Sequence, residues 1–236
     1  NEPSSSEDQL LLRLRQLPEE QQTTLERALK EEARGITQHL ALNEEQQHAL
    51  EALKSSLLPS SAPAVLPFTL LLGIFGSGKT HLLSAIILLL HRTSARMLQS
   101  SPSFRPLRVL VVSWTNVAVD RVLLALEQRG LTDFLRHGSA TRMSKDLLKY
   151  SSMQLKQDRR LRQPKEAKPV VVGATIASCS SLDDDEFDFV IVDEATQIPE
   201  PACLVPLLRF NPSRVLLVGD PKQLPPTLRG SNSRLK

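Results

Sequence analysis

The segment from Gly73 to Thr80 reads Gly-Ile-Phe-Gly-Ser-Gly-Lys-Thr, which matches the spacing G-x-x-x-x-G-K-[ST] of a phosphate-binding loop. Glycine suits such a loop because a Cβ would keep backbone N–H groups away from phosphate oxygens. We expect Lys79 to reach the β- and γ-phosphates of a nucleotide, and the Thr80 hydroxyl to ligate Mg²⁺. The other loop residues expected at the nucleotide are Gly73, Gly76, Ser77 and Gly78. A glycine-rich turn that binds nothing is the alternative.

Two adjacent acids, Asp193 and Glu194, end an apolar run that starts at Phe187. Charge at the end of a buried strand is unfavourable unless a cation lies near it. We expect Asp193 to hold Mg²⁺ opposite Thr80, and Glu194 to orient and deprotonate the attacking water. The alternative is that the two acids only cap a following helix.

A further acid, Asp220, follows the apolar run 214–219 and precedes a proline-rich turn that contains Gln223. Gln223 could sense the γ-phosphate of a bound nucleotide and transmit its loss to neighbouring loops. The alternative is a simple surface turn.

Gln46 lies three residues after Asn43, the spacing of a capping box at a helix start. Its amide could equally meet an adenine edge, which needs one donor and one acceptor. The local sequence leaves both interpretations open.

Thr115 and Asn116 follow the continuous apolar run 107–113 and precede a helix expected from about 116 to 128. Because ligands bind at the carboxyl ends of strands in open α/β sheets, these residues could contact a phosphodiester backbone. Either residue could also be only the N-cap, and the two roles are compatible.

The stretch 144–168 is the most basic part of the chain. It is either a solvated helical insertion or a surface that faces nucleic acid.

Apolar runs at 68–72, 107–113, 169–175, 187–192 and 214–218 alternate with helical patterns, and each run predicts a buried strand. This order predicts an α/β fold: a P-loop domain with a mainly parallel sheet flanked by helices. We expect a helical N-terminal segment over 1–41, whose second helix ends at Gly35. The ATP-binding domain is expected over 42–232, with a frayed end over 233–236.

The composition is typical of a soluble globular protein, with 41% hydrophobic and 23% charged residues and a net charge of +3. The mild positive charge permits a nucleic-acid partner without requiring one. Cys179 and Cys203 have neither metal-ligand spacing nor a disulfide framework, which favours an intracellular compartment. The longest apolar run, Leu82 to Leu90, is too short to span a bilayer, so we expect no membrane partner. Without an initiating Met, the chain is expected to be a segment of a longer protein.

Several segments together resemble superfamily 1 helicases. Asp193-Glu194-Ala195-Thr196-Gln197 is similar to their D-E-A-x-Q box, and the segment from Gly219 to Pro226 to motif III. Thr115 to Asp120 resembles motif Ia, and Leu42 to Gln46 the Q motif. The set resembles the 5′→3′ branch that includes the nonsense-mediated-decay helicase. Within that branch it is most similar to the GRF-type zinc-finger-containing DNA helicases.

The resemblance implies the first RecA-like motor domain of an ATP-dependent 5′→3′ DNA helicase or translocase that serves DNA repair or recombination. It implies ATP and Mg²⁺ as cofactors, with Gln46 at adenine and with Gln197 and Gln223 at the γ-phosphate. Thr115, Asn116 and Thr175 would touch single-stranded nucleic acid, with DNA favoured over RNA. A monomeric motor is implied, in the nucleus or alternatively the cytoplasm. The second RecA-like domain of the family is absent from this chain, so we expect the chain alone to hydrolyse ATP poorly.

Three alternatives remain open. An RNA helicase of the same branch would carry the same motifs. A different P-loop enzyme is less favoured, because a GTPase needs an N-K-x-D motif that the sequence lacks. An inactive scaffold is disfavoured by the intact residues Lys79, Thr80, Asp193 and Glu194.

Overall fold

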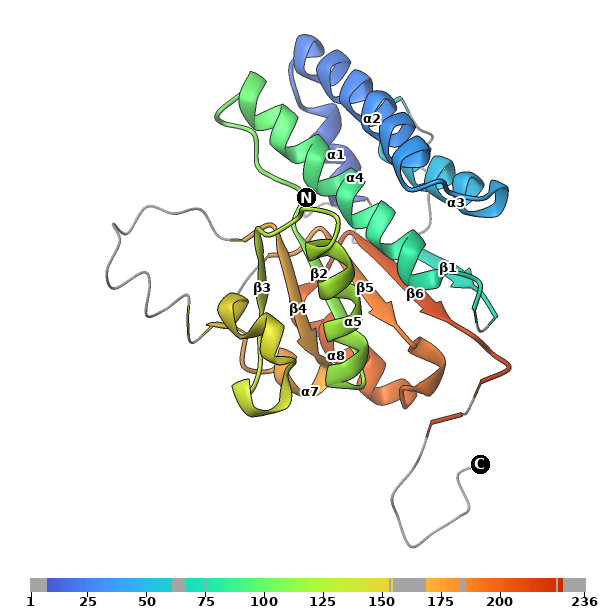
Figure 1. Ribbon diagram of the computed structural model, residues 1–236. Helices are drawn as coiled ribbons and strands as arrows, with labels where there is room; N and C mark the ends of the chain where they lie inside the picture. Colours follow the sequence, from blue (N-terminus) through green and yellow to red (C-terminus); the bar gives the residue numbers. More distant parts are fainter. Residues whose placement is uncertain are drawn as a thin grey trace, which may run out of the picture.

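The computed structural model describes residues 8–60, 67–74, 76–152, 154, 169–182, 186–223 and 225–226. Within these residues six strands form one sheet in the order β1-β6-β5-β2-β4-β3, and every neighbouring pair is parallel (Figure 1). The strands are β1 (Phe68–Leu72), β2 (Val109–Ser113), β3 (Phe134–Arg136), β4 (Val171–Thr175), β5 (Phe189–Asp193) and β6 (Arg214–Gly219). The predicted α/β fold with a parallel sheet is therefore confirmed.

Alternate residues of the central strands enter two hydrophobic clusters, one on each face of the sheet. On one face Val109, Val111 and Ile191 pack with α4 (Lys79–Ser100) and α5 (Asn116–Glu127). On the other face Leu110 and Val192 pack with α7 (Ile176–Cys179) and α8 (Glu200–Phe210). The central strands are buried on both faces, and for this reason their sequences are continuous apolar runs.

The N-terminal helices form a further layer over α4. They are α1 (Gln9–Arg15), α2 (Glu19–His39) and α3 (Glu44–Ser56), and α2 packs along α4 (Figure 1). The prediction that the second helix ends at Gly35 is wrong, because α2 continues for four more residues. A fully buried Ile36 follows the glycine, so packing of this turn outweighs the modest helix cost of one glycine.

Strand β1 also differs from the sequence prediction of a buried strand. Phe68, Leu70 and Leu72 are 50%, 65% and 68% exposed. The reason is its place at the edge of the sheet, where β6 is its one partner. An apolar run predicts a strand, but it does not reveal the position of that strand in the sheet.

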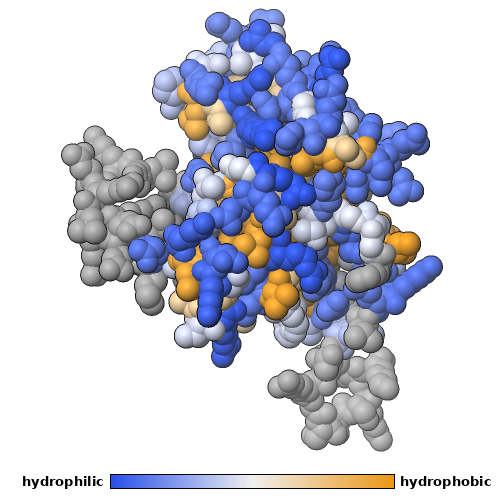
Figure 2. Space-filling model, in the orientation of Figure 1, coloured by the Kyte–Doolittle hydropathy of each residue, from blue (hydrophilic) through white to orange (hydrophobic). Residues whose placement is uncertain are grey.

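The remaining short elements are 3-10 turns: η1 (Ala140–Arg142), η2 (Lys145–Tyr150) and η3 (Ala195–Gln197). Most of the basic stretch 144–168 and the tail from 227 onward lie outside the described residues. In the parts of the chain that are described, no helix has the length and apolarity needed to cross a membrane. Most of the surface in Figure 2 is hydrophilic, with small and separate hydrophobic patches.

Candidate active site

A cavity of about 500 Å³ lies at the carboxyl edge of the sheet. Strand register explains why distant sequence segments meet there: Ser113 pairs with both Asp193 and Thr175, and Leu72 pairs with Gly219. The cavity is lined by Gly76, Gly78, Lys79, Thr80, Arg121, Asp193, Glu194, Thr196, Gly219, Asp220 and Gln223. The structure therefore brings four of the predicted loop residues, from Gly76 to Thr80, together with the two acids and Gln223 in one site. Gly73 and Ser77 do not line this cavity.

The phosphate-binding loop uses its glycines where the chain has no room for a side chain. Gly76 and Gly78 have φ of 81° and 79°, in the left-handed region that favours glycine. A Cβ on Gly73 would lie 2.5 Å from the Ser77 Oγ, and a Cβ on Gly78 would lie 2.6 Å from the Gln46 Nε2. The loop is thus a tight turn whose backbone can approach a ligand closely.

Lys79 and Thr80 begin helix α4 directly after the loop. The Lys79 Nζ donates to the carbonyl oxygens of Gly73 and Ile74, at 2.7 and 3.0 Å. These contacts place the ammonium over the mouth of the loop, at the positive end of the α4 dipole. Lys79 and Thr80 both line the cavity, as an anion site at a helix start requires.

The two acids occupy the opposite wall of the cavity, at the end of β5. Asp193 is 3% exposed, and burial raises the pKa of its carboxyl to about 6. The negative charge of Glu194 also raises this pKa, whereas the Glu194 backbone N–H, Arg121 and Lys79 lower it. Glu194 adopts φ of 55°, so the chain turns sharply at this residue and ends the strand. A buried carboxyl with a raised pKa is the kind of group that a cation would return to its charged form.

Arg121 is a member of the site that the sequence did not reveal. It lies on α5, and its Nη1 is 3.6 Å from the Glu194 Oε1. The one available signal was the charged pair Asp120-Arg121 within the apolar sequence of this helix. Thr196 was also missed, although its hydroxyl donates to the Asp220 carbonyl oxygen at 3.2 Å.

The two glutamines expected at the γ-phosphate form a chain of hydrogen bonds with Asp220, which was expected in the nucleotide site. The Gln197 Nε2 donates to the Gln223 Oε1 at 3.3 Å, and the Gln223 Nε2 donates to the Asp220 Oδ2 at 3.2 Å. Gln223 and Asp220 line the cavity, while Gln197 stands behind Gln223. A movement of the Gln223 side chain would therefore be passed through this hydrogen bond to Gln197, in the turn that follows β5.

Gln46 takes part in two arrangements at once. Its backbone N–H donates to the Asn43 Oδ1, and its Oε1 accepts from the Asn43 N–H, so the predicted capping box is confirmed. Its Nε2 also donates to the Ser77 carbonyl oxygen at 3.2 Å. The Gln46 side chain thus contacts the phosphate loop but does not line the cavity.

The three candidate nucleic-acid residues lie at the carboxyl ends of β2 and β4. Thr115 caps α5 by accepting from the Ala118 N–H at 3.2 Å, and Thr175 caps α7 in the same way through Ser178. The N-cap interpretation is therefore confirmed for Thr115, and the cap formed by Thr175 is an additional finding. Asn116, the first residue of α5, accepts a hydrogen bond from Arg136 at 2.8 Å. Arg136 had no signal in the sequence.

The residues of this cavity suit a nucleotide with Mg²⁺. The close glycine turn leaves space for phosphate oxygens, and Thr80 and Asp193 supply the hard oxygen ligands that Mg²⁺ prefers. Among the described residues no group of three or more His, Cys, Asp or Glu forms a metal cage. Mg²⁺ in a nucleotide site needs no such cage, because phosphates and water complete its coordination.

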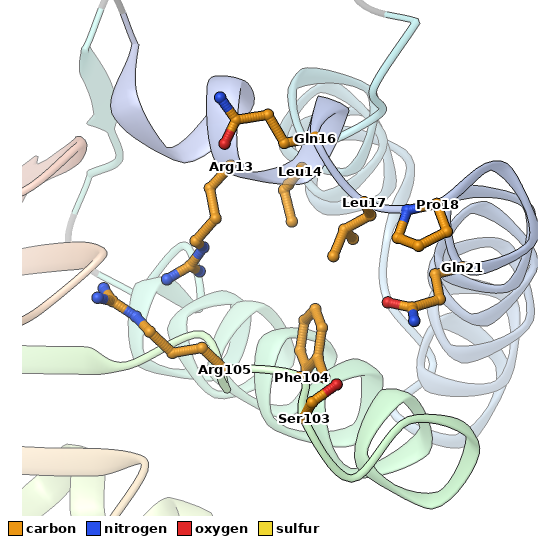
Figure 3. A pocket seen from close by; sticks show the side chains of 9 residues that line it. All are labelled: Arg13, Leu14, Gln16, Leu17, Pro18, Gln21, Ser103, Phe104 and Arg105. Carbon is orange, nitrogen blue, oxygen red and sulfur yellow. The ribbon is translucent and has the colours of Figure 1, made fainter.

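A second cavity, of about 380 Å³, lies between α1, the start of α2 and the segment after α4 (Figure 3). Arg13 and Arg105 extend toward one another along one side of it, and Leu14, Leu17 and Phe104 supply apolar wall. Both arginines pair with Asp188, at 3.0 and 3.1 Å. Asp188 directly precedes β5, so this cavity lies at the amino ends of the strands. The phosphate loop lies at their carboxyl ends.

Comparison with known proteins agrees with the geometry. The family model described as AAA domain (AAA_11) matches residues 41–170 and 167–230. The chain belongs to this family. The 5′-3′ DNA helicase ZGRF1 of Mus musculus is 37% identical over 234 residues, which cover 84% of this chain and 12% of that protein.

The DNA replication ATP-dependent helicase/nuclease DNA2 gives two further matches. The Gallus gallus protein is 36% identical over 174 residues, covering 71% of this chain and 16% of that protein. The Saccharomyces cerevisiae protein is 32% identical over 176 residues, covering 71% and 10%. The resemblance to superfamily 1 helicases is confirmed. The chain spans less than a fifth of the length of each of these relatives.

Proposed function

We propose that this AAA-family domain binds and hydrolyses ATP as the first motor domain of a 5′→3′ DNA helicase or translocase that acts in DNA repair. The observation that carries the proposal is the single cavity that joins Lys79, Thr80, Asp193, Glu194 and Gln223. Its relatives ZGRF1 and DNA2, both named as DNA helicases, support the choice of reaction.

Each side chain has a defined part in hydrolysis. Lys79 contacts the β- and γ-phosphates, and the N–H groups at the start of α4 surround them. Thr80 and Asp193 would hold Mg²⁺, and the ion would supply positive charge beside the transferred phosphoryl group. Glu194, on the same wall as Asp193, orients the attacking water and accepts its proton.

Three glutamines and an acid complete the nucleotide site in this proposal. Gln223 contacts the γ-phosphate, and Gln197 and Asp220 hold its amide through the hydrogen bonds described above. Because these bonds join Gln223 to the turn after β5, a movement of Gln223 on loss of the γ-phosphate would be passed to Gln197. Gln46 contacts the adenine edge from its place against Ser77, and the capping box fixes its side chain for this task.

Thr115, Asn116 and Thr175 contact single-stranded DNA along the edge where α5 and α7 begin. Thr115 binds the Ala118 N–H, and the other N–H groups in the first turn of α5 are donors that phosphate oxygens can accept from. Thr175 lies beside this helix start, because it pairs with Ser113 at the end of β2. We propose a nuclear location and a monomeric motor, in keeping with a repair helicase. Single-stranded RNA is the alternative substrate, and among the described residues no contact selects for it.

A strand-displacement assay tests the proposal. The full-length protein that carries this domain should separate a DNA duplex with a 5′ single-stranded DNA tail in the presence of ATP and Mg²⁺. A duplex with a 3′ tail or an RNA tail should be separated more slowly. Lys79→Ala removes a charge-assisted contact to the nucleotide, so ATP affinity should fall about 10- to 100-fold and separation should stop. Equal activity on RNA tails would overturn the DNA assignment, and full activity of Lys79→Ala would overturn the site.

A further inference from the structure

Arg136 is a fully buried cation at the end of β3, with 0% of its surface exposed. Its Nε donates to the Asp120 Oδ1 at 2.6 Å, its Nη1 to the His137 carbonyl oxygen at 2.6 Å, and its Nη2 to the Asn116 Oδ1 at 2.8 Å. The other carboxylate oxygen of Asp120 accepts from the Ser144 N–H at 2.6 Å. One ion pair thus joins β3, the first turns of α5 and the segment before η2.

Burial of an ion pair of this kind carries a large desolvation free energy. Apolar side chains of similar volume often stabilise a fold equally well or better, because they avoid the desolvation of two charges. The polarity of Arg136 therefore calls for a role beyond packing. Its third contact, to Asn116, reaches the residue proposed to meet single-stranded DNA.

The contact fixes the orientation of the Asn116 amide. A guanidinium has N–H donors and no acceptor, so the amide must turn its oxygen toward Arg136. The amide nitrogen, which is a donor only, then points away from the buried network. Asn116 is half-buried at the first position of α5, so part of its side chain is open to solvent at the helix start.

We infer that Arg136 is a positioning residue, which holds the Asn116 amide with its N–H₂ toward the nucleic acid so that it donates to a phosphate oxygen. Phosphate oxygens only accept hydrogen bonds, so the opposite orientation of the amide would be repulsive. The inference rests on the proposed function, because it takes Asn116 as a contact to single-stranded DNA.

Asn116→Asp provides the sharpest test. An aspartate keeps an oxygen for Arg136, so the melting temperature of the variant should equal or exceed that of the parent protein. It replaces the outward donor with an anion, so its affinity for a fluorescent oligothymidine, measured by anisotropy, should fall more than tenfold. Asn116→Ala loses the donor without adding charge and should show a smaller loss. Val117→Asp is the charge control, because Val117 is the exposed next residue on the same helix, and its loss should be smaller than that of Asn116→Asp.

Arg136→Lys tests the positioning residue itself. A lysine keeps the positive charge for Asp120 but lacks the planar fork that reaches Asp120 and Asn116 together. DNA affinity should fall several-fold, while affinity for a fluorescent ATP analogue, which a folding defect would also lower, should stay unchanged.

The possible results separate the inference from the proposed function. If Asn116→Asp binds no more weakly than Asn116→Ala or Val117→Asp, the amide orientation is overturned while Asn116 remains a contact. If neither Asn116 variant changes DNA affinity, the contact itself is overturned, and the inference with it. A graded loss, greatest for Asn116→Asp, supports both.

Discussion

At the residue scale, Asp193 is a buried carboxyl whose charged form the fold disfavours. Its pKa is raised to about 6, first by burial and then by the charge of Glu194. Near pH 4 the group is largely protonated in the folded protein, and in the unfolded chain it is only about half ionised, because the ordinary pKa of an aspartate is about 3.9. Above pH 6 it is ionised in both states, but only the folded state bears the cost. The nucleotide-free protein therefore loses stability from this residue as pH rises from about 4 to 6.

Asp193→Asn should remove that cost. In urea unfolding without nucleotide, we expect the variant to be more stable than the parent protein by up to about 3 kcal/mol at pH 7.5, and by little at pH 4. Addition of Mg²⁺ and ATP should stabilise the parent protein more than the variant, because only the parent offers a carboxylate to the cation. A variant that is less stable at pH 7.5, or a gain equal at both pH values, would contradict the assigned environment.

The residues that the sequence could reveal are those with a fixed local spacing. Lys79, Thr80, Asp193 and Glu194 belong to short motifs whose chemistry follows from neighbouring residues along the chain. Arg121 and Arg136 were missed because their partners are distant in sequence: Glu194 is 73 residues from Arg121 (194 − 121), and Asn116 and Arg136 lie on different elements. Their roles depend on the order β5-β2-β4-β3, which no local pattern specifies.

At the element scale, helix α5 joins the two halves of the site. Its first residue is Asn116, and its Arg121 approaches Glu194 in the nucleotide cavity. The helix rests on β4 at Gly173, where a Cβ would lie 2.7 Å from the Leu123 Cδ1 and 3.1 Å from the Val119 Cγ1. The absence of a side chain on Gly173 therefore sets the distance between α5 and the sheet.

Gly173→Ala should push α5 away from β4. We expect a destabilisation of about 1–3 kcal/mol in urea unfolding and a weaker affinity for single-stranded DNA. Gly35→Ala is the matched control, because a Cβ on Gly35 meets nothing within 4 Å inside α2. Alanine is the better helix former, so the control should gain about 0.5–1 kcal/mol. If both variants shift stability in the same direction, the close contact between α5 and β4 is not the determining feature.

The sequence predicted the positions of helices and strands along the chain better than it predicted their tertiary contacts. Continuous apolar runs predicted the strands, because a parallel strand buried on both faces needs such a run. The apolar run of β1 wrongly predicted that this strand is buried. Gly35 wrongly predicted the end of α2. Both errors concern tertiary contacts: an edge position in one case, and packing against α4 in the other.

At the scale of the whole molecule, one edge of the parallel sheet carries all the proposed chemistry. The nucleotide cavity lies at the carboxyl ends of β6 and β5 and beside the loop that follows β1. The residues proposed to contact DNA lie at the carboxyl ends of β2 and β4, which are the next strands in the sheet. The N-terminal helices pack on α4, behind the phosphate loop, and extend the hydrophobic core on that side. This arrangement gives one contiguous face on which nucleotide turnover and strand contact can influence each other through α5.

The central claim is that this face hydrolyses ATP through Glu194 in response to single-stranded DNA. The most direct measurement is the steady-state rate of phosphate release by the full-length protein that carries this domain and by its Glu194→Gln variant, each with and without a single-stranded oligonucleotide. The account predicts that DNA stimulates the parent protein. It also predicts that Glu194→Gln loses at least about a hundredfold in rate while still binding a fluorescent ATP analogue. A Glu194→Gln protein that hydrolyses ATP at the parent rate, or a parent protein indifferent to DNA, would contradict it.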